Sequence, residues 1–188
     1  QTMKEDRVTL TIVLVAFFAA ITFVATSIQV PMPSLIGKPF VHLGNAAALL
    51  SVLLLGYKRG ALAGGMGLAI FDLIHNYVLD APYYFFEVFV VGGAAILVAR
   101  TLRYQRNRQT VNLVLIIFSA IITKFITSTL HNFVMALVKG LTVQPAIAAT
   151  ITSIIPTIVN CIITMIVVLI VFPILDHQLH GKLMMSHN

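Results

Sequence analysis

The sequence predicts an all-α integral membrane protein, built as one bundle of six transmembrane helices with both termini in the cytoplasm. The first observation behind this fold class is composition. Hydrophobic residues occupy 59% of the 188 positions and charged residues only 10%, so the chain is far more apolar than a soluble domain. The second is length, because successive apolar runs of about 17–30 residues can each cross a bilayer as a helix. We therefore expect residues 1–188 to form a single transmembrane domain surrounded by membrane lipid.

The distribution of positive charge predicts the orientation. A net charge of +6 would suggest nucleic-acid binding in a soluble protein, but here the basic residues fall between the apolar runs, and we expect no nucleic-acid partner. With a cytoplasmic N-terminus, the cytoplasmic side carries Lys4, Arg7, Lys58, Arg59, Arg100, Arg103, Arg106, Arg108 and Lys182, and the outer side carries Lys38 and Lys139. The positive-inside rule then places both termini in the cytoplasm.

The six helices are expected at residues 8–28, 41–56, 59–78, 83–102, 111–138 and 146–175. The first follows basic residues as a signal peptide does, but its apolar core is longer than the ~7–15 residues of such a segment, which favours a membrane helix. Ala16 and Ala20 lie one turn apart on this helix. Small residues at this spacing let another helix approach closely, either within this chain or in a partner protein.

Residues 29–40 are predicted to form an irregular connection, because Pro31, Pro33 and Pro39 together with Gly37 prevent a regular helix. It is the longest irregular stretch in the apolar part of the chain. Two interpretations stay open at this point, a lid over a binding site and a plain linker.

The helix expected at 59–78 combines a glycine-rich first half with a polar end. The glycines are Gly60, Gly64, Gly65 and Gly67. Glycine allows neighbouring helices to pack very closely, so we expect close helix contacts here. The far end carries Asp72, His75 and Asn76 at spacings that place all three on one helical face.

The last two helices each carry a polar stripe. In the helix at 111–138, Lys124 and His131 share one face of an otherwise apolar segment. An ionisable group at this depth costs roughly 2.5–3.5 kcal/mol on insertion scales, so Lys124 is expected to face protein, water or a ligand. It either serves a binding site, or only pairs with a neighbouring helix or snorkels. In the helix at 146–175 the stripe consists of Thr150, Ser153, Thr157, Asn160 and Thr164, beside Pro156, which is expected to kink the helix.

With this topology the polar residues of five helices fall in the outer half of the membrane, which predicts a binding pocket open to the outside. The candidate substrate-binding residues are His42, Asn45, Asp72, His75, Asn76, Tyr84, Glu87, His131 and Asn132, with Lys124 and Asn160 at the floor. Tyr84 belongs to a group of aromatic residues at the same level, some of which are expected to stack on a planar ligand.

The motifs of two enzyme classes are missing from the sequence. Neither His-Glu-x-x-His nor Gly-x-Ser-x-Gly is present, so we predict no catalytic site and no metal site, and the chain is not expected to be an enzyme. A self-contained ion-coupled transporter, in which Lys124 and Glu87 relay protons, is a distant alternative.

Several motifs resemble those of the S component, the substrate-binding membrane subunit, of energy-coupling factor (ECF) vitamin transporters. They are Ala16-xxx-Ala20, the proline-containing first loop, Phe40-Val-His-Leu-Gly-Asn45, Leu55-Gly-Tyr-Lys-Arg-Gly60-Ala, Gly64-Gly65-Met-Gly67, Phe71-Asp72-Leu and Ala81-Pro82. The likeness covers nearly all of the chain. It is greatest to the subgroup associated with hydroxymethylpyrimidine or pyridoxine, and looser to riboflavin-type members.

The resemblance implies that the chain binds a small vitamin from outside the plasma membrane of a prokaryote. It would deliver the vitamin to a transmembrane T component driven by two cytoplasmic ATPase subunits. Hydroxymethylpyrimidine or pyridoxine is the expected vitamin, and riboflavin, thiamine or pantothenate are alternatives. The resemblance also implies that Ala16 and Ala20 contact the T component and that residues 29–40 are the lid. No cofactor is expected in this chain, because ATP would be used by the partner subunits and no Gly-x-x-x-x-Gly-Lys motif is present.

Overall fold

The structure, a computed structural model, describes residues 2–33, 39–104 and 110–185. Within these ranges it contains six helices, as predicted, and one short antiparallel hairpin. The elements are α1 (Thr2–Ser27), β1 (Gln29–Pro31), β2 (Phe40–His42), α2 (Gly44–Leu55), α3 (Tyr57–Ile74), α4 (Ala81–Thr101), α5 (Thr110–Val138) and α6 (Val143–Met185). The protein is therefore an α-helical bundle with a small strand pair added to it.

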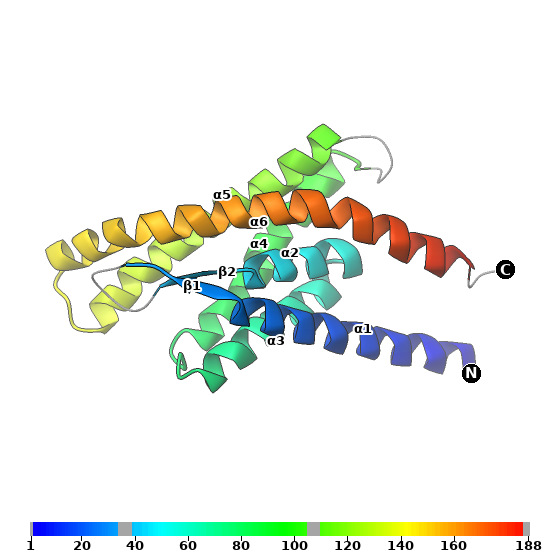
Figure 1. Cartoon of the computed structure of the whole chain (residues 1–188), viewed down its shortest axis with the longest axis horizontal. Helices are drawn as coiled ribbons and strands as arrows, with labels where there is room; N and C mark the ends of the chain where they lie inside the picture. Colours follow the sequence, from blue (N-terminus) through cyan, green and yellow to red (C-terminus); the bar gives the residue numbers. More distant parts are fainter. Residues whose placement is uncertain (1, 34–38, 105–109, 186–188) are drawn as a thin grey trace.

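The helices form an elongated bundle in which both termini lie at the same end (Figure 1). α3 packs against α1, α2 and α4, and α5 packs against α4 and α6. α2 is the most enclosed helix, since every residue from Gly44 to Val52 is buried. The main core joins α2 to α4, α5 and α6 through Ala46, Leu49, Leu50, Ala95, Ile116, Ile117, Val168 and Phe172.

Four helices, α1, α4, α5 and α6, are long and apolar enough to cross a membrane. Their outer faces carry large apolar side chains that are more than half exposed, among them Ile12, Leu97, Val111, Ile151 and Ile155. Such a surface suits contact with lipid. α2 has 12 residues and so rises only about 18 Å, against a hydrocarbon core of about 30 Å. Six membrane-spanning helices therefore stay a prediction as far as α2 and α3 are concerned.

The ends of two helices differ from the sequence expectation. α3 ends at Ile74 rather than at residue 78, because Asn76 adopts a left-handed conformation with φ of 65°. Asparagine accepts this conformation more readily than most residues, and it stops a helix. α6 continues unbroken through Pro156 and Pro173, well past the expected end at residue 175.

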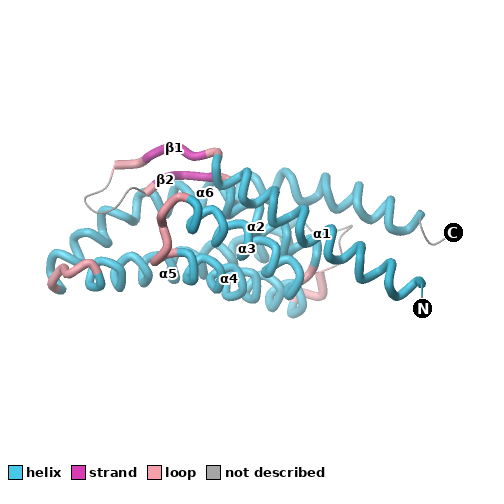
Figure 2. The backbone as a smooth tube through the Cα atoms, turned by 90° about the horizontal axis from the view of Figure 1, so that it is seen from below, coloured by secondary structure: helices cyan, strands magenta, loops and turns pink. Residues whose placement is uncertain are grey.

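The connection expected to be irregular begins and ends with paired strands. Val30 of β1 lies opposite Val41 of β2, and the Met32 N–H donates to the Pro39 carbonyl oxygen at 2.9 Å. Figure 2 shows this hairpin crossing one side of the bundle beside α6. Strands of three residues are too short to show an alternating pattern, so the sequence did not reveal them. Residues 34–38 of the proposed lid lie outside the described residues.

The glycines of α3 let it approach three other helices. A Cβ atom at Gly60 would lie 2.2 Å from the Ser51 carbonyl oxygen of α2. One at Gly67 would lie 2.6 Å from the Ala19 carbonyl oxygen of α1, and Gly65 meets the backbone of α4 in the same way. A side chain does not fit at these distances, so the close contacts predicted from the glycine pattern are confirmed.

We predict that Gly60→Ala lowers the free energy of unfolding by about 1–3 kcal/mol, because the added methyl group forces α2 and α3 apart. Thermal unfolding in detergent measures this change. Gly93→Ala on α4 is the matched control, since its Cβ atom would lie 3.4 Å from the nearest atom, on the Tyr57 ring. Equal stability of the two variants would contradict the close α2–α3 contact.

Candidate functional site

A cavity of about 210 Å³ lies inside the bundle and is lined by β2 and by side chains from all six helices. The α5 and α6 residues that line it belong to the halves nearest the α5–α6 connection, away from the end that holds the termini (Figure 1). Its walls mix aromatic and apolar side chains with a few polar groups. This composition is usual in pockets for small ligands.

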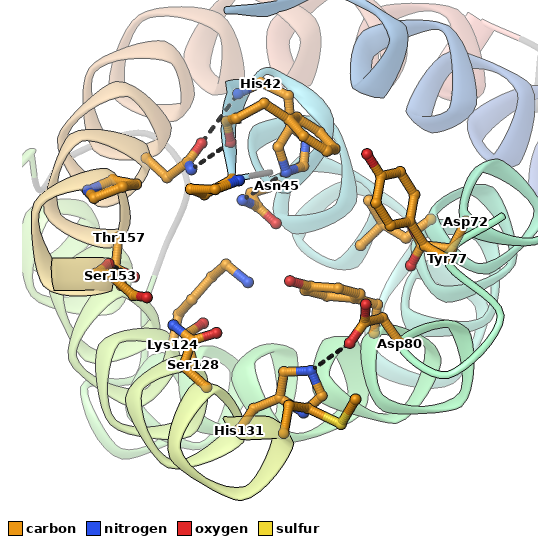
Figure 3. Close-up of a pocket in the computed structure, with 18 of the residues that line it drawn as sticks. His42, Asn45, Asp72, Tyr77, Asp80, Lys124, Ser128, His131, Ser153 and Thr157 are labelled. Atoms are coloured by element: carbon orange, nitrogen blue, oxygen red, sulfur yellow. Dashed lines mark hydrogen bonds and ion pairs between the residues drawn. The ribbon is translucent and has the colours of Figure 1, made fainter. Parts of the chain in front are cut away.

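The structure places eight of the eleven predicted site residues around this cavity. They are His42, Asn45, Asp72, Tyr84, Lys124, His131, Asn132 and Asn160. Figure 3 labels five of them, which lie on β2, α2, α3 and α5 and surround one space: His42, Asn45, Asp72, Lys124 and His131. Phe40, Tyr77, Asp80, Ser128, Lys139, Ser153 and Thr157 also line the cavity, although they were not among the predicted substrate-binding residues.

His75 and Asn76 lie outside the cavity and are exposed. Their predicted position depended on α3 continuing to residue 78, and α3 ends at Ile74. The His75 ring stacks on the Phe71 ring at 3.9 Å, and its Nδ1 lies 2.8 Å from the Phe71 carbonyl oxygen. His75 thus covers the end of α3, and Asn76 provides the turn that follows.

Glu87 lies behind the cavity wall, where four side chains donate hydrogen bonds to its carboxylate. Its Oε2 accepts from Lys124 Nζ at 2.5 Å. Its Oε1 accepts from Tyr83 Oη at 2.5 Å, from Thr127 Oγ1 at 2.9 Å and from Ser128 Oγ at 3.1 Å. The residue is only 4% exposed, and a carboxylate can be buried so deeply only when it is paired and hydrogen-bonded. All of these contacts are to protein, so the geometry gives Glu87 a structural role.

Lys124 connects this network to the cavity. It is 8% exposed, and its ammonium group points into the cavity (Figure 3). There the nitrogen lies 5.5 Å from the centre of the Tyr84 ring, within the range of a cation–π contact. Both interpretations of the intramembrane lysine therefore apply, because Lys124 pairs with a neighbouring helix and also lines a pocket.

A second polar contact ties α5 to the start of α4. His131 Nε2 lies 2.9 Å from Asp80 Oδ1, and the His131 ring stacks on the Tyr83 ring at 3.6 Å with an angle of 7°. Asp80 was not among the predicted substrate-binding residues. It could have been predicted from its spacing, because Asp80 precedes Tyr84 by one helical turn and the two side chains therefore share a helical face.

Asn160 holds the hairpin against α6. Its Nδ2 donates to the Phe40 carbonyl oxygen at 3.0 Å, and its Oδ1 accepts from the His42 N–H at 3.0 Å. The amide group thus bonds to β2 much as a neighbouring strand would. His42 Nδ1 accepts from the Gly44 N–H at 3.1 Å. Burial, and then the positive charge of Lys124, lower the pKa of His42 to about 3, so its ring is neutral at physiological pH.

Asp72 differs from the other two acids at the site. It is 6% exposed and lines the cavity from the last turn of α3. Within the described residues its Oδ2 atom is buried and has no hydrogen-bond partner.

The described residues contain no group of three or more His, Cys, Asp or Glu side chains placed to hold a metal ion.

Comparisons with known proteins point to one family. A family model described as "ECF-type riboflavin transporter, S component" matches residues 7–177. A solved structure described as "Structure and mechanism of the S component of a bacterial ECF transporter" is similar, with a TM-score of 0.63 and 21% identity over 93% of this chain and 98% of that chain. Because the sequence identity is only 21%, the structural similarity establishes the fold alone. No curated protein matches the sequence.

We predict that Lys124→Met lowers the free energy of unfolding by about 3–5 kcal/mol, because it leaves the Glu87 carboxylate buried and unpaired. The double variant with Glu87→Gln should lose much less than the sum of the two single changes. Chemical or thermal unfolding of all three variants measures this coupling. Lys139→Met, which removes an exposed lysine at the cavity rim, is the control and should change stability by less than about 0.5 kcal/mol. Additive losses would show that the pair does not form.

Proposed function

Because the chain belongs to the family of ECF-type riboflavin transporter S components, we propose that its cavity binds a small vitamin from outside the cell. Members of this family are substrate-binding components of transporters, and the family is not one of enzymes. One observation carries the proposal. Eight polar or aromatic residues predicted from the sequence surround a single cavity at the end of the bundle away from the termini. With cytoplasmic termini, that end lies on the outer side of the membrane.

The size of the cavity favours a vitamin with a single substituted ring. Its volume is about 210 Å³, whereas a protein cavity of about 150 Å³ holds benzene. Phe40, Tyr77 and Tyr84 supply aromatic faces against which a flat ring can pack. His131 and Asn132 supply hydrogen-bonding groups at the same level. Hydroxymethylpyrimidine and pyridoxine meet these requirements best.

Riboflavin is the second candidate, and the description of the matching family is the observation that favours it. Its three fused rings and sugar-like chain need more room than a single ring does. Thiamine and pantothenate are further alternatives. An ion-coupled transporter that works alone is more distant, because the Glu87 carboxylate is held by four hydrogen bonds and a proton relay through Lys124 would have to break them.

The proposed transport cycle needs partner proteins. After capture, the chain would dock on a transmembrane T component, and two ATPase subunits in the cytoplasm of a prokaryote would supply the energy. Ala16 and Ala20 are both exposed on α1, which supports a contact with a partner rather than packing inside this chain. Leu10 is also exposed on α1, but it lies roughly 120° around the helix from Ala16.

Calorimetric titration of the detergent-purified protein tests the proposed function. The panel consists of pyridoxine, hydroxymethylpyrimidine, thiamine, riboflavin, pantothenate and folate. We predict one tight ligand, from the single-ring members. Tight binding of riboflavin alone would overturn the assignment of the vitamin but keep the role. Failure of every vitamin to bind would overturn vitamin capture itself.

We predict that Ala16→Trp leaves vitamin binding within about twofold of the parent protein but abolishes co-purification with the T component, because the indole fills the space that a partner helix needs. Binding is measured by titration, and assembly by pull-down from cells that also express the transporter partners. Leu10→Trp is the matched control and should assemble normally. Normal assembly of Ala16→Trp would contradict the proposed contact surface.

A further inference from the structure

Two of the three acids at the cavity are balanced by a neighbouring group. Glu87 pairs with Lys124, and Asp80 lies 2.9 Å from His131 Nε2. Asp72 is the exception among the described residues, because its Oδ2 is buried without a hydrogen-bond partner. A buried carboxyl oxygen in this state has lost its hydration without gaining a hydrogen bond.

The charges lie on opposite sides of the cavity. Figure 3 places Asp72 and Asp80 together on one side and the Lys124 ammonium group on the other. His42 faces the same space but is neutral. Lys139 also lines the cavity, but it is exposed at the end of α5, where solvent screens its charge. A ligand inside the cavity therefore meets an acidic wall and, across from it, a hydrogen-bond donor.

We propose that Asp72 makes this cavity select ligands by charge, so that it accepts a ring with an amino group or another hydrogen-bond donor and rejects a carboxylate. This inference rests on the proposed function and names the chemical class of its ligand. The donor would bind the Asp72 carboxyl group, and a ring nitrogen or hydroxyl oxygen would accept from Lys124. A carboxylate of the ligand would instead share the site with the Asp72 carboxyl group, and two carboxyl groups that are shielded from water cannot both ionise without a large cost in binding free energy.

Two titrations test the inference. In the first, the vitamin that binds in the panel is titrated into Asp72→Asn, which keeps the shape of the side chain and replaces the carboxyl group with an amide. The affinity should fall about tenfold to a hundredfold, as expected when a buried hydrogen-bond acceptor for the ligand is lost. Asp6→Asn, the same change at an exposed position of α1, is the control and should bind as the parent protein does.

In the second titration, ligands that share one ring but differ in charge are compared in the parent protein. Pyridoxamine carries an amino group, pyridoxine is neutral and 4-pyridoxate carries a carboxylate. Pyridoxamine or pyridoxine should bind at least about tenfold more tightly than 4-pyridoxate. This ranking needs no variant, so it decides the matter even if Asp72→Asn does not fold.

The outcomes separate the two proposals. If the panel yields a ligand and Asp72→Asn binds it unchanged, selection by Asp72 is wrong while vitamin capture stands. Equal or tighter binding of 4-pyridoxate also overturns the selection by charge. If no vitamin binds to the parent protein, both the proposed vitamin capture and the proposed selection by Asp72 are wrong.

Discussion

The ion pair between Glu87 of α4 and Lys124 of α5 is the interaction on which the site depends. Both side chains are more than nine-tenths buried inside an apolar bundle, where an unpaired charge would cost several kcal/mol. Tyr83, Thr127 and Ser128 complete the hydrogen bonding of the carboxylate, so the charge is fully satisfied. The pair thereby sets the register of the two helices. It also brings the Lys124 ammonium group and the Tyr84 ring to the same cavity.

The other walls are held by polar contacts of the same kind. His131 meets Asp80 across the α4–α5 boundary, and Asn160 joins α6 to the backbone of β2. Each contact links residues that are more than 50 positions apart in the sequence. Apolar packing alone does not distinguish one helix register from another. The cavity therefore takes its shape from a few polar contacts between elements. Asp72 is the lining carboxyl group whose Oδ2 atom these contacts leave without a partner among the described residues.

Much of the site could be predicted because helical spacing is local. Lys124 and His131 share a face by periodicity alone, and the positive-inside rule placed His131 in the same outer half of the membrane as Asn45 and Tyr84, with Lys124 at the floor below them. His75 and Asn76 lay outside the cavity because a single left-handed residue ended α3 early. Asp80 was not predicted because it precedes the expected start of the fourth helix at residue 83, although it lies one helical turn before Tyr84. The partner of Glu87 lay on another helix, and no local pattern specifies such a pairing.

By itself, the sequence determined the membrane character, the number of helices, the close contacts of the α3 glycines and eight of the residues around the cavity. These follow from hydropathy, helical period and side-chain volume, which act over a few turns of one chain segment. Only the tertiary structure decided that Glu87 is a structural partner of Lys124, that Asn160 holds the hairpin and that Asp72 Oδ2 has no hydrogen-bond partner within the described residues. Such roles depend on distances of about 3 Å between atoms of different elements, and these distances arise only when the whole bundle has packed.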